Sequence, residues 1–191
     1  MFLSAQVDVV QKVSISEHKQ QESVATLRKM TSVDIDDFME WATDDEVTKY
    51  MMWNSYTSRE EAERFFQEVV EKHAWFRVIC IDKKVVGSIT LDKGKGAHSC
   101  KAELGYVLSR KYWGKGIATQ AIKIALHSGF NDLDVERIEA FVDPSNVASQ
   151  RVLEKNGLEK EGLLKNYIIQ KGVVRDRVVY ALAKPVSKKS L

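Results

Sequence analysis

The chain has 191 residues, of which 44% are hydrophobic and 29% are charged, and 29 basic and 27 acidic side chains leave a net charge of +2. These values are typical of one globular domain with a full core. The balanced charge, with no basic stripe interleaved with aromatic residues, argues against nucleic acid as a main partner. Two cysteines, Cys80 and Cys100, cannot form a disulfide scaffold, and no Cys/His cluster has the spacing of metal ligands, so we expect no metal.

The sequence predicts neither a signal peptide nor a membrane span. No apolar run approaches the ~20 residues that span a bilayer, and residues 1–10 lack the basic region of a signal peptide. We therefore expect a cytoplasmic protein without a membrane partner. Residues 1–23 predict a flexible N-terminal extension, residues 24–184 the folded domain, and residues 185–191 a basic tail.

The first half of the chain predicts a strand, three helices and a hairpin. Ser58 and Glu61 fit a capping box at the start of the clearest helix. Apolar residues then recur at the spacing of one helical face: Phe65, Phe66, Val69 and Val70. In chain order we expect a strand at Val24–Met30, helices at Val33–Trp41, Asp44–Tyr50 and Thr57–His73, and hairpin strands at Trp75–Ile81 and Val85–Leu91 around the turn Asp82–Lys84.

The second half predicts four strands and two helices. Gly157 is a natural C-terminal cap for the second helix, and Lys171-Gly172 is a turn between the last two strands. We expect strands at Lys101–Ser109, Val135–Val142, Leu163–Gln170 and Arg175–Ala183, and helices at Gly114–Phe130 and Asn146–Asn156. The alternation of elements indicates a mixed α/β domain with one central sheet.

A glycine-containing turn, Lys111–Gly116, lies where a strand ends and a helix begins. Gly114 and Gly116 allow the backbone to turn sharply and to approach a ligand. The first N–H groups of a helix lack internal partners and lie at the positive end of its dipole, so a pyrophosphate fits there. Lys111 and Lys115 would add positive charge. The turn matches neither GxGxxG nor a Walker loop, and by itself it is equally compatible with an ordinary tight turn.

Three segments together resemble the GCN5-related N-acetyltransferase (GNAT) superfamily and, within it, the ribosomal-protein-alanine acetyltransferases. They are Ala102–Leu108 (AELGYVL), Arg110–Thr119 (RKYWGKGIAT) and Asn146–Leu158 (NVASQRVLEKNGL). Lys111 stands where Gln or Arg is usual, and Leu158 where Phe is usual. The resemblance covers about residues 24–184. It implies one mixed, mostly antiparallel sheet of about seven strands, splayed between strands four and five and flanked by helices.

The resemblance also implies that acetyl-CoA is the cosubstrate. In the family the pantetheine arm pairs with the backbone of strand four, and the pyrophosphate lies on the turn that follows. The residues expected to bind the coenzyme are Tyr106, Val107, Leu108 and Ser109 in the strand, Lys111, Trp113, Gly114, Lys115, Gly116, Ile117, Ala118 and Thr119 at the turn, and Asn146 and Ser149 in the later helix.

Acetyl transfer to an amine requires a base, because a primary amine is mostly protonated at pH 7. Glu103 is the first candidate, since the resemblance places the base in this strand, although a solvent-facing strand residue is an equal alternative. Glu139 and Asp143 are weaker candidates. We expect a backbone N–H near Val107 to polarise the thioester carbonyl.

The departing thiolate needs a hydrogen-bond or proton donor. Many family members carry a tyrosine for this role in the helix after strand five, and here that position is Leu153. The resemblance implies Ser149 as the substitute, with a purely structural hydroxyl as the alternative. Tyr167 is a further possibility.

The acceptor is expected to bind across the early helices and the last hairpin. An acidic stretch there would suit a cationic acceptor, but acids at helix starts on a solvated face are the simpler interpretation: Asp34, Asp36, Asp37, Glu40, Asp44, Asp45 and Glu46. We expect a monomer or homodimer that acetylates a protein or peptide N-terminus. The alternatives are a polyamine acetyltransferase and a non-catalytic acetyl-CoA-binding module.

Overall fold

The computed structural model describes residues 23–185, so the predicted N-terminal extension and basic tail lie almost wholly outside the described residues. One seven-stranded sheet has the order β1-β2-β3-β4-β5-β7-β6. All neighbouring strands are antiparallel except β4 and β5, which confirms the predicted mixed sheet. The strands are β1 (Thr26–Arg28), β2 (Phe76–Ile81), β3 (Lys84–Lys93), β4 (Lys101–Leu108), β5 (Arg137–Val142), β6 (Glu159–Gln170) and β7 (Val173–Ala183).

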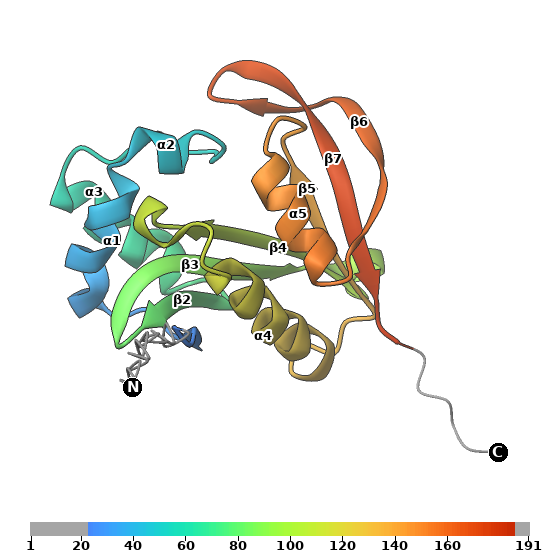
Figure 1. The fold of residues 1–191 in the computed structure, drawn as a ribbon, viewed down its shortest axis with the longest axis horizontal. Coiled ribbons are helices and arrows are strands. Elements are labelled where there is room, and N and C mark those ends of the chain that lie inside the picture. The colour runs from blue at the N-terminus through green and yellow to red at the C-terminus, as the bar shows by residue number, and fades with distance from the viewer. Residues whose placement is uncertain (1–22, 186–191) are drawn as a thin grey trace, which may run out of the picture.

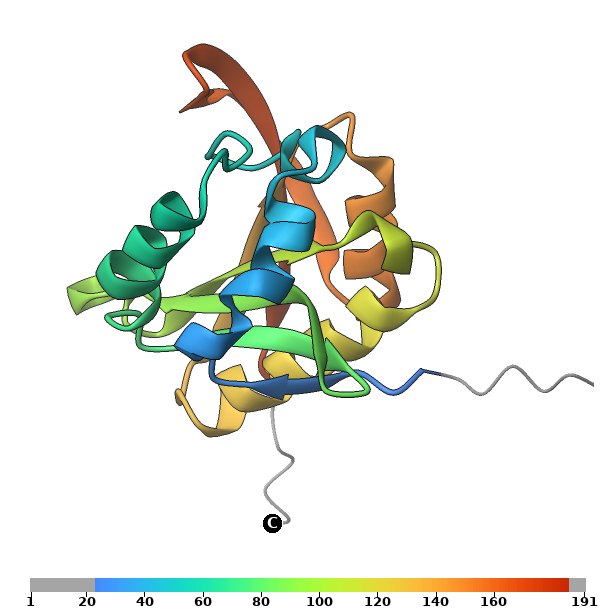
Figure 2. The same ribbon diagram turned by 90° about the vertical axis from the view of Figure 1, so that its left-hand side faces the viewer.

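Helices cover both faces of the sheet (Figures 1 and 2). Helices α1 and α3 lie on one face, and α4 and α5 lie on the other. Within residues 23–185, none of the helices is long and apolar enough to span a bilayer. The helices are α1 (Ile35–Ala42), α2 (Asp45–Thr48), α3 (Arg59–Phe65), α4 (Ile117–Asn131) and α5 (Val147–Lys155), with short 3-10 or π segments η1 (Ser32–Asp34), η2 (Phe66–Val70), η3 (Gly96–His98) and η4 (Arg110–Tyr112).

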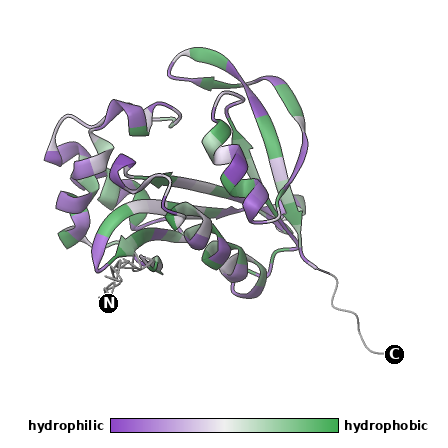
Figure 3. Cartoon of the chain, viewed as in Figure 1, coloured by the Kyte–Doolittle hydropathy of each residue, from purple (hydrophilic) through white to green (hydrophobic). Residues whose placement is uncertain are grey.

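Each face of the sheet has its own apolar core. The core under α4 and α5 includes Ile122 and Ile138, and the core under α1 and α3 includes Phe38 and Trp41, all at most 2% exposed. Strands β2 and β3 are buried on both sides and therefore read as nearly continuous apolar runs. The helices mix polar and apolar residues because each buries only one side (Figure 3).

The helix predicted at Thr57–His73 is the largest local error. Regular helix ends at Phe65 and continues as the π-helical segment η2. The wider π turn breaks the 3.6-residue period, so Val69 is 43% exposed although it belongs to the predicted apolar stripe. Val33 is likewise 83% exposed, because it lies in the 3-10 turn η1 and not in a helix.

Two other predictions changed in detail. The Ser58 hydroxyl accepts a hydrogen bond from the Glu61 N–H at 3.3 Å, but the Glu61 carboxylate accepts from Thr57 rather than from Ser58, so only half of the capping box forms. The β2–β3 hairpin turns on Asp82 and Lys83, both with positive φ, which suits the twist of a two-residue hairpin loop.

Candidate active site

Strands β4 and β5 pair over a short stretch and then separate. Their parallel pairing runs from Lys101↔Arg137 to Glu103↔Glu139, and none of the later β4 residues has a β5 partner. Figure 1 shows the two strands diverging from this point. The splayed sheet expected from the sequence is therefore present, and the second half of β4 faces a gap.

The backbone N–H and C=O groups of every second residue of β4 point into this gap. The Ser109 N–H donates to the Val86 carbonyl at 2.8 Å, and the Gly94 N–H donates to the Lys101 carbonyl at 2.9 Å. Because antiparallel residues alternate between bonded and non-bonded pairs, the odd-numbered residues of β4 bond to β3. The N–H and C=O groups of Tyr106 and the N–H of Leu108 point to the side that β5 leaves open.

This alternation specifies which backbone N–H near Val107 is available, a point that the expectation left open. The N–H of Val107 faces β3 and cannot polarise a carbonyl in the gap, whereas the Leu108 N–H can. The Leu108 carbonyl is already used, because the indole N–H of Trp113 donates to it at 2.7 Å. The register of a strand with its neighbour decides which backbone groups are free. This register cannot be predicted from the sequence of β4 alone.

The turn after β4 presents free N–H groups. Gly114 and Gly116 have φ of 73° and 76°, and a Cβ at either would meet no atom within 4 Å. Helix α4 begins at Ile117, later than predicted, because Gly116 in the left-handed region cannot be helical. Within the described chain, no acceptor bonds the N–H groups of residues 114–119. An open helix N-terminus with these groups can hold a pyrophosphate.

The lysines of the turn have different surroundings. Lys111 lies 3.8 Å from a Glu40 carboxylate oxygen, and its neighbour Arg110 pairs with Asp44 at 3.0 Å. The Lys115 ammonium lies 5.4 Å from the centre of the Tyr112 ring. Lys115 thus forms no ion pair with the described residues, whereas Lys111 is partly neutralised.

Helix α5 brings Asn146 and Ser149 to the same gap. The Asn146 side-chain oxygen accepts the Ser149 N–H at 3.1 Å and so caps the helix. The Ser149 hydroxyl lies 2.7 Å from the phenolic oxygen of Tyr106. Leu153, one turn later, is fully buried in the core under α4 and α5. Burial raises the pKa of Tyr106 to about 12, opposed by the hydrogen bond with Ser149.

The side chain of Tyr106 is a site residue that sequence reasoning missed, since only its backbone was assigned to the coenzyme. A signal was available. Strand alternation places Tyr106 on the face opposite Glu103, which is the face that the helix after strand five must cover.

Glu103 lies on the other face of the sheet. It shares that face with Val107, which packs into the core under α1 and α3. Asp92 and Glu139 are its direct neighbours on β3 and β5, so three carboxylates form a row across three strands. Although the Glu103 side chain reaches solvent, surrounding atoms desolvate its carboxylate, and this effect together with the charges of Asp92 and Glu139 raises its pKa.

The two neighbours of Glu103 already have partners. The Asp92 carboxylate lies 2.8 Å from His73 Nε2. Glu139 is 7% exposed and accepts from both Lys101 and Arg137. Glu103 is therefore the member of the row that forms no ion pair with a described residue.

The weaker base candidates are engaged elsewhere. Asp143 accepts from Ser145 and lies 3.7 Å from the buried Arg177; although burial opposes the change, these partners lower its pKa. Tyr167 stacks on Phe141, with ring centres 5.1 Å apart. Neither geometry brings a free base or acid to the point where β4 and β5 separate.

The acidic stretch before residue 47 is mainly structural. Asp34 pairs with Arg28 at 2.7 Å, Asp44 with Arg110, and Glu40 with Lys84 at 2.6 Å. Three more acids have partners: Asp36 pairs with Arg59, Asp37 accepts from the Val85 N–H and Asp45 accepts from Ser55. Glu46 has no side-chain partner among the described residues. The simpler interpretation of this stretch is favoured.

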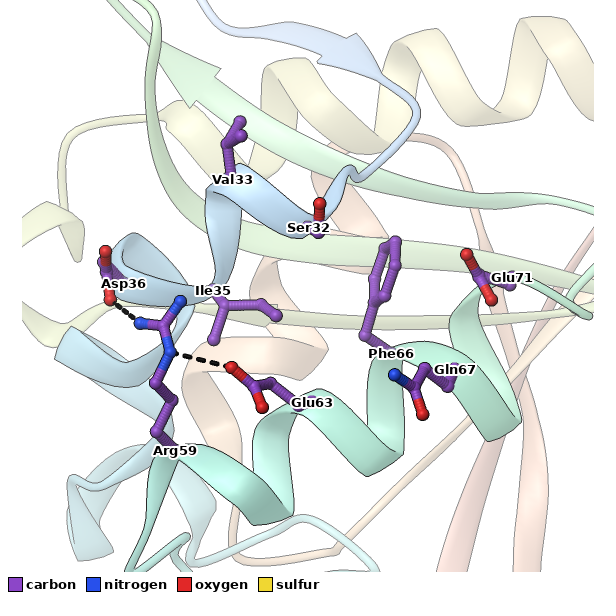
Figure 4. Close-up of a pocket in the computed structure, with 9 residues that line it drawn as sticks. All are labelled: Ser32, Val33, Ile35, Asp36, Arg59, Glu63, Phe66, Gln67 and Glu71. Carbon is purple, nitrogen blue, oxygen red and sulfur yellow. Dashed lines mark hydrogen bonds and ion pairs between the residues drawn. The ribbon is translucent and has the colours of Figure 1, made fainter.

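Long-range hydrogen bonds join the last hairpin to the end of α2 and the residues that follow it. The Gln170 amide donates to the Met51 carbonyl at 3.0 Å, and the Lys171 ammonium donates to the Thr48 carbonyl at 2.9 Å. The early helices and the β6–β7 hairpin, which were expected to share the acceptor, therefore touch each other. A separate open groove between η1–α1 and α3–η2 (Figure 4) contains none of the predicted site residues: it is lined by Ser32, Val33, Ile35, Asp36, Arg59, Glu63, Phe66, Gln67 and Glu71.

Comparisons with known proteins agree with this geometry. Residues 25–159 match the family described as acetyltransferase (GNAT) domain. The chain is 36% identical over 168 residues to the uncharacterised N-acetyltransferase p20 of Bacillus licheniformis, covering 83% of this chain and 92% of that protein.

Solved structures share the fold. RimJ of Mycobacterium smegmatis, in complex with a CoA disulfide, has a TM-score of 0.71 at 27% identity, covering 85% of this chain and 83% of that one. Spermidine N-acetyltransferase of Vibrio cholerae, in complex with CoA and spermine, has a TM-score of 0.71 at 22% identity, covering 83% and 95%; this likeness concerns the fold alone. With its splayed β4–β5 pair and open turn, the chain belongs to the GNAT family of acetyltransferases.

Proposed function

We propose that this protein transfers the acetyl group of acetyl-CoA to a primary amine, with a protein or peptide N-terminus as acceptor. The observation that carries the proposal is the gap between β4 and β5, where the backbone groups of Tyr106 and Leu108 have no strand partner. A pantetheine arm carries amide groups that can pair with such an edge as an added strand would. The free N–H groups of residues 114–119 would hold the pyrophosphate.

The two faces of the sheet would then bring the reactants together from opposite sides. Acetyl-CoA would lie on the α4–α5 side, and the amine would arrive from the side of Glu103. Glu103 takes a proton from the ammonium, and its raised pKa suits a base that works near neutral pH. The Leu108 N–H polarises the thioester carbonyl, the amine nitrogen bonds to the carbonyl carbon, and the C–S bond breaks. Holding both reactants in place contributes much of the rate.

A polyamine is the second candidate acceptor. It is favoured by the row of Asp92, Glu103 and Glu139, which a multiply charged amine would complement, and by the spermine bound to the Vibrio cholerae relative. Against it, Asp92 already contacts His73 and Glu139 is already paired with Lys101. The peptide N-terminus therefore remains the primary proposal.

A coupled thiol-release assay tests the proposal. The protein is incubated with acetyl-CoA and a panel of peptides with free N-termini, the same peptides with blocked N-termini, spermidine and spermine, and products are identified by mass spectrometry. We expect release of CoA with free peptides and acetylation at their α-amino groups. Turnover with polyamines alone would replace the peptide acceptor, and tight acetyl-CoA binding without turnover on any amine would refute the enzymatic proposal.

A further inference from the structure

The phenol of Tyr106 contacts the first turn of α5. This is the helix in which Leu153 stands at the position where many family members carry a tyrosine. Tyr106 extends from β4 toward the first turn of α5, and its oxygen is 2.7 Å from the Ser149 hydroxyl and 3.3 Å from the Ser149 carbonyl. The corresponding helix position, Leu153, is filled by a fully buried core residue. The same strand residue also presents its backbone N–H and C=O to the gap between β4 and β5.

We propose that Tyr106 is a positioning residue for the departing thiolate: its O–H donates to Ser149 Oγ and so directs the Ser149 proton toward the coenzyme sulfur. This inference rests on the proposed acetyl transfer. When the C–S bond breaks, its electron pair goes to sulfur, and the amine proton has gone to Glu103. The thiolate therefore leaves with a hydrogen bond from Ser149, and no proton has to cross from the tyrosine.

Two features of the site support this arrangement. The Ser149 N–H is held by the Asn146 side chain at 3.1 Å, which fixes the first turn of α5 beneath the phenol. Tyr106 is protonated at neutral pH, as an ordinary tyrosine is, and burial raises its pKa further, to about 12. The phenol has one proton, and Ser149 Oγ at 2.7 Å is a nearer acceptor for it than the Ser149 carbonyl at 3.3 Å. A phenol that donates to Oγ leaves the serine proton free for another partner.

A comparison of two tyrosines tests the role. Tyr180 on β7 also tethers α5, since its phenolic oxygen lies 2.9 Å from Glu154 Oε1, the nearer acceptor for its proton, and 3.2 Å from Gln150 Oε1. It has no hydrogen bond with Ser149. The variants are Tyr106→Phe, Ser149→Ala, the double variant and the matched control Tyr180→Phe. Each is assayed for kcat, for KM of acetyl-CoA and for CoA affinity by calorimetry, and its fold is checked by circular dichroism.

We expect Tyr106→Phe to lower kcat about tenfold, because the hydrogen bond that it removes acts on a developing charge, with little change in KM or CoA affinity. Ser149→Ala should lower kcat at least as much, and the double variant should be no slower than Ser149→Ala, since residues that act as a unit are not additive. Tyr180→Phe should keep wild-type kcat.

Three results would overturn the inference. A wild-type kcat for Tyr106→Phe would remove the role outright. An equal loss in Tyr180→Phe would reduce it to tethering of α5, and multiplicative losses in the double variant would separate Tyr106 from Ser149. In each case the wild-type protein still transfers acetyl groups, so the proposed function survives; a wild type without turnover would refute both.

Discussion

On the α4–α5 face of the sheet the groups available to a ligand belong mainly to the backbone, whereas on the α1–α3 face they are side chains. The first set consists of the strand edge at Tyr106 and Leu108 and the N–H groups of residues 114–119. The second set is the carboxylate row around Glu103. In the proposed complex, backbone groups bind the coenzyme, which is the same for every acceptor, while side chains can change with the acceptor without disturbing the fold.

The two sets also differ in how many of their groups already have a hydrogen-bond or ion-pair partner within the protein. The turn N–H groups have no acceptor among the described residues, but most of the acids on the acceptor side are paired with cations or N–H groups. The coenzyme side is thus prepared for an anion, and the acceptor side keeps Glu103 as its free carboxylate. The following variants break or sharpen this contrast, from the largest expected effect to the smallest.

Gly116→Arg should have the largest effect and should act on the coenzyme side only. The new side chain occupies the open space over the turn, and its positive φ adds about 1–2 kcal/mol of strain. We expect CoA affinity measured by calorimetry to fall by at least about a hundredfold, while the circular dichroism spectrum is kept. Gly96→Arg is the control, because Gly96 also has positive φ and open surroundings but lies in another loop. Unchanged affinity in Gly116→Arg would disprove the pyrophosphate assignment.

Glu103→Gln should act on the acceptor side only. Loss of a general base lowers kcat about a hundredfold, and the loss should be greatest below neutral pH, where the amine is mostly protonated. Affinity for CoA should not change. The pH–rate profile checks this expectation, with the exposed Glu159→Gln as a matched control. A profile identical to that of the wild type would exclude Glu103 as the base.

Asp92→Asn should have a smaller effect, limited to pH dependence. The base must be ionised, so the wild-type rate falls as the pH drops through the raised pKa of Glu103. Removing the Asp92 charge takes away one cause of that increase, while burial and Glu139 remain. The acidic limb of the profile should therefore move to lower pH. A limb that moves to higher pH, or does not move, would contradict the coupling across the row.

Glu46→Gln should have the smallest effect. Glu46 is exposed and belongs to the acidic stretch that we interpret as structural. A charge in solvent is screened within about 10 Å at ordinary ionic strength, so we expect KM for peptide and polyamine acceptors to change by less than about twofold. A large increase in KM for spermidine alone would restore the stretch as a recognition surface for cationic acceptors.

The sequence predicted the elements and the glycine turn between β4 and α4 well because their signals are local. Gly114 and Gly116 lie in the sequence between the strand and the helix that they join. Asn146 lies three residues before the N–H group that it caps. It failed where a helix changes its period, as at Val69, because propensity does not report a π turn. It left open which backbone N–H near Val107 is free, because the direction of a strand N–H depends on the register with β3.

By itself the sequence determined the family, the fold class and the glycine turn to which we assign the pyrophosphate, since these depend on residue types at fixed short spacings. Only the tertiary structure decided which groups face each other across long separations. Tyr106 meets Ser149 and Asp92 meets Glu103 through sheet register and helix packing. Contacts of this kind produce no periodic pattern in the sequence, because each partner by itself is an ordinary residue of its own strand or helix.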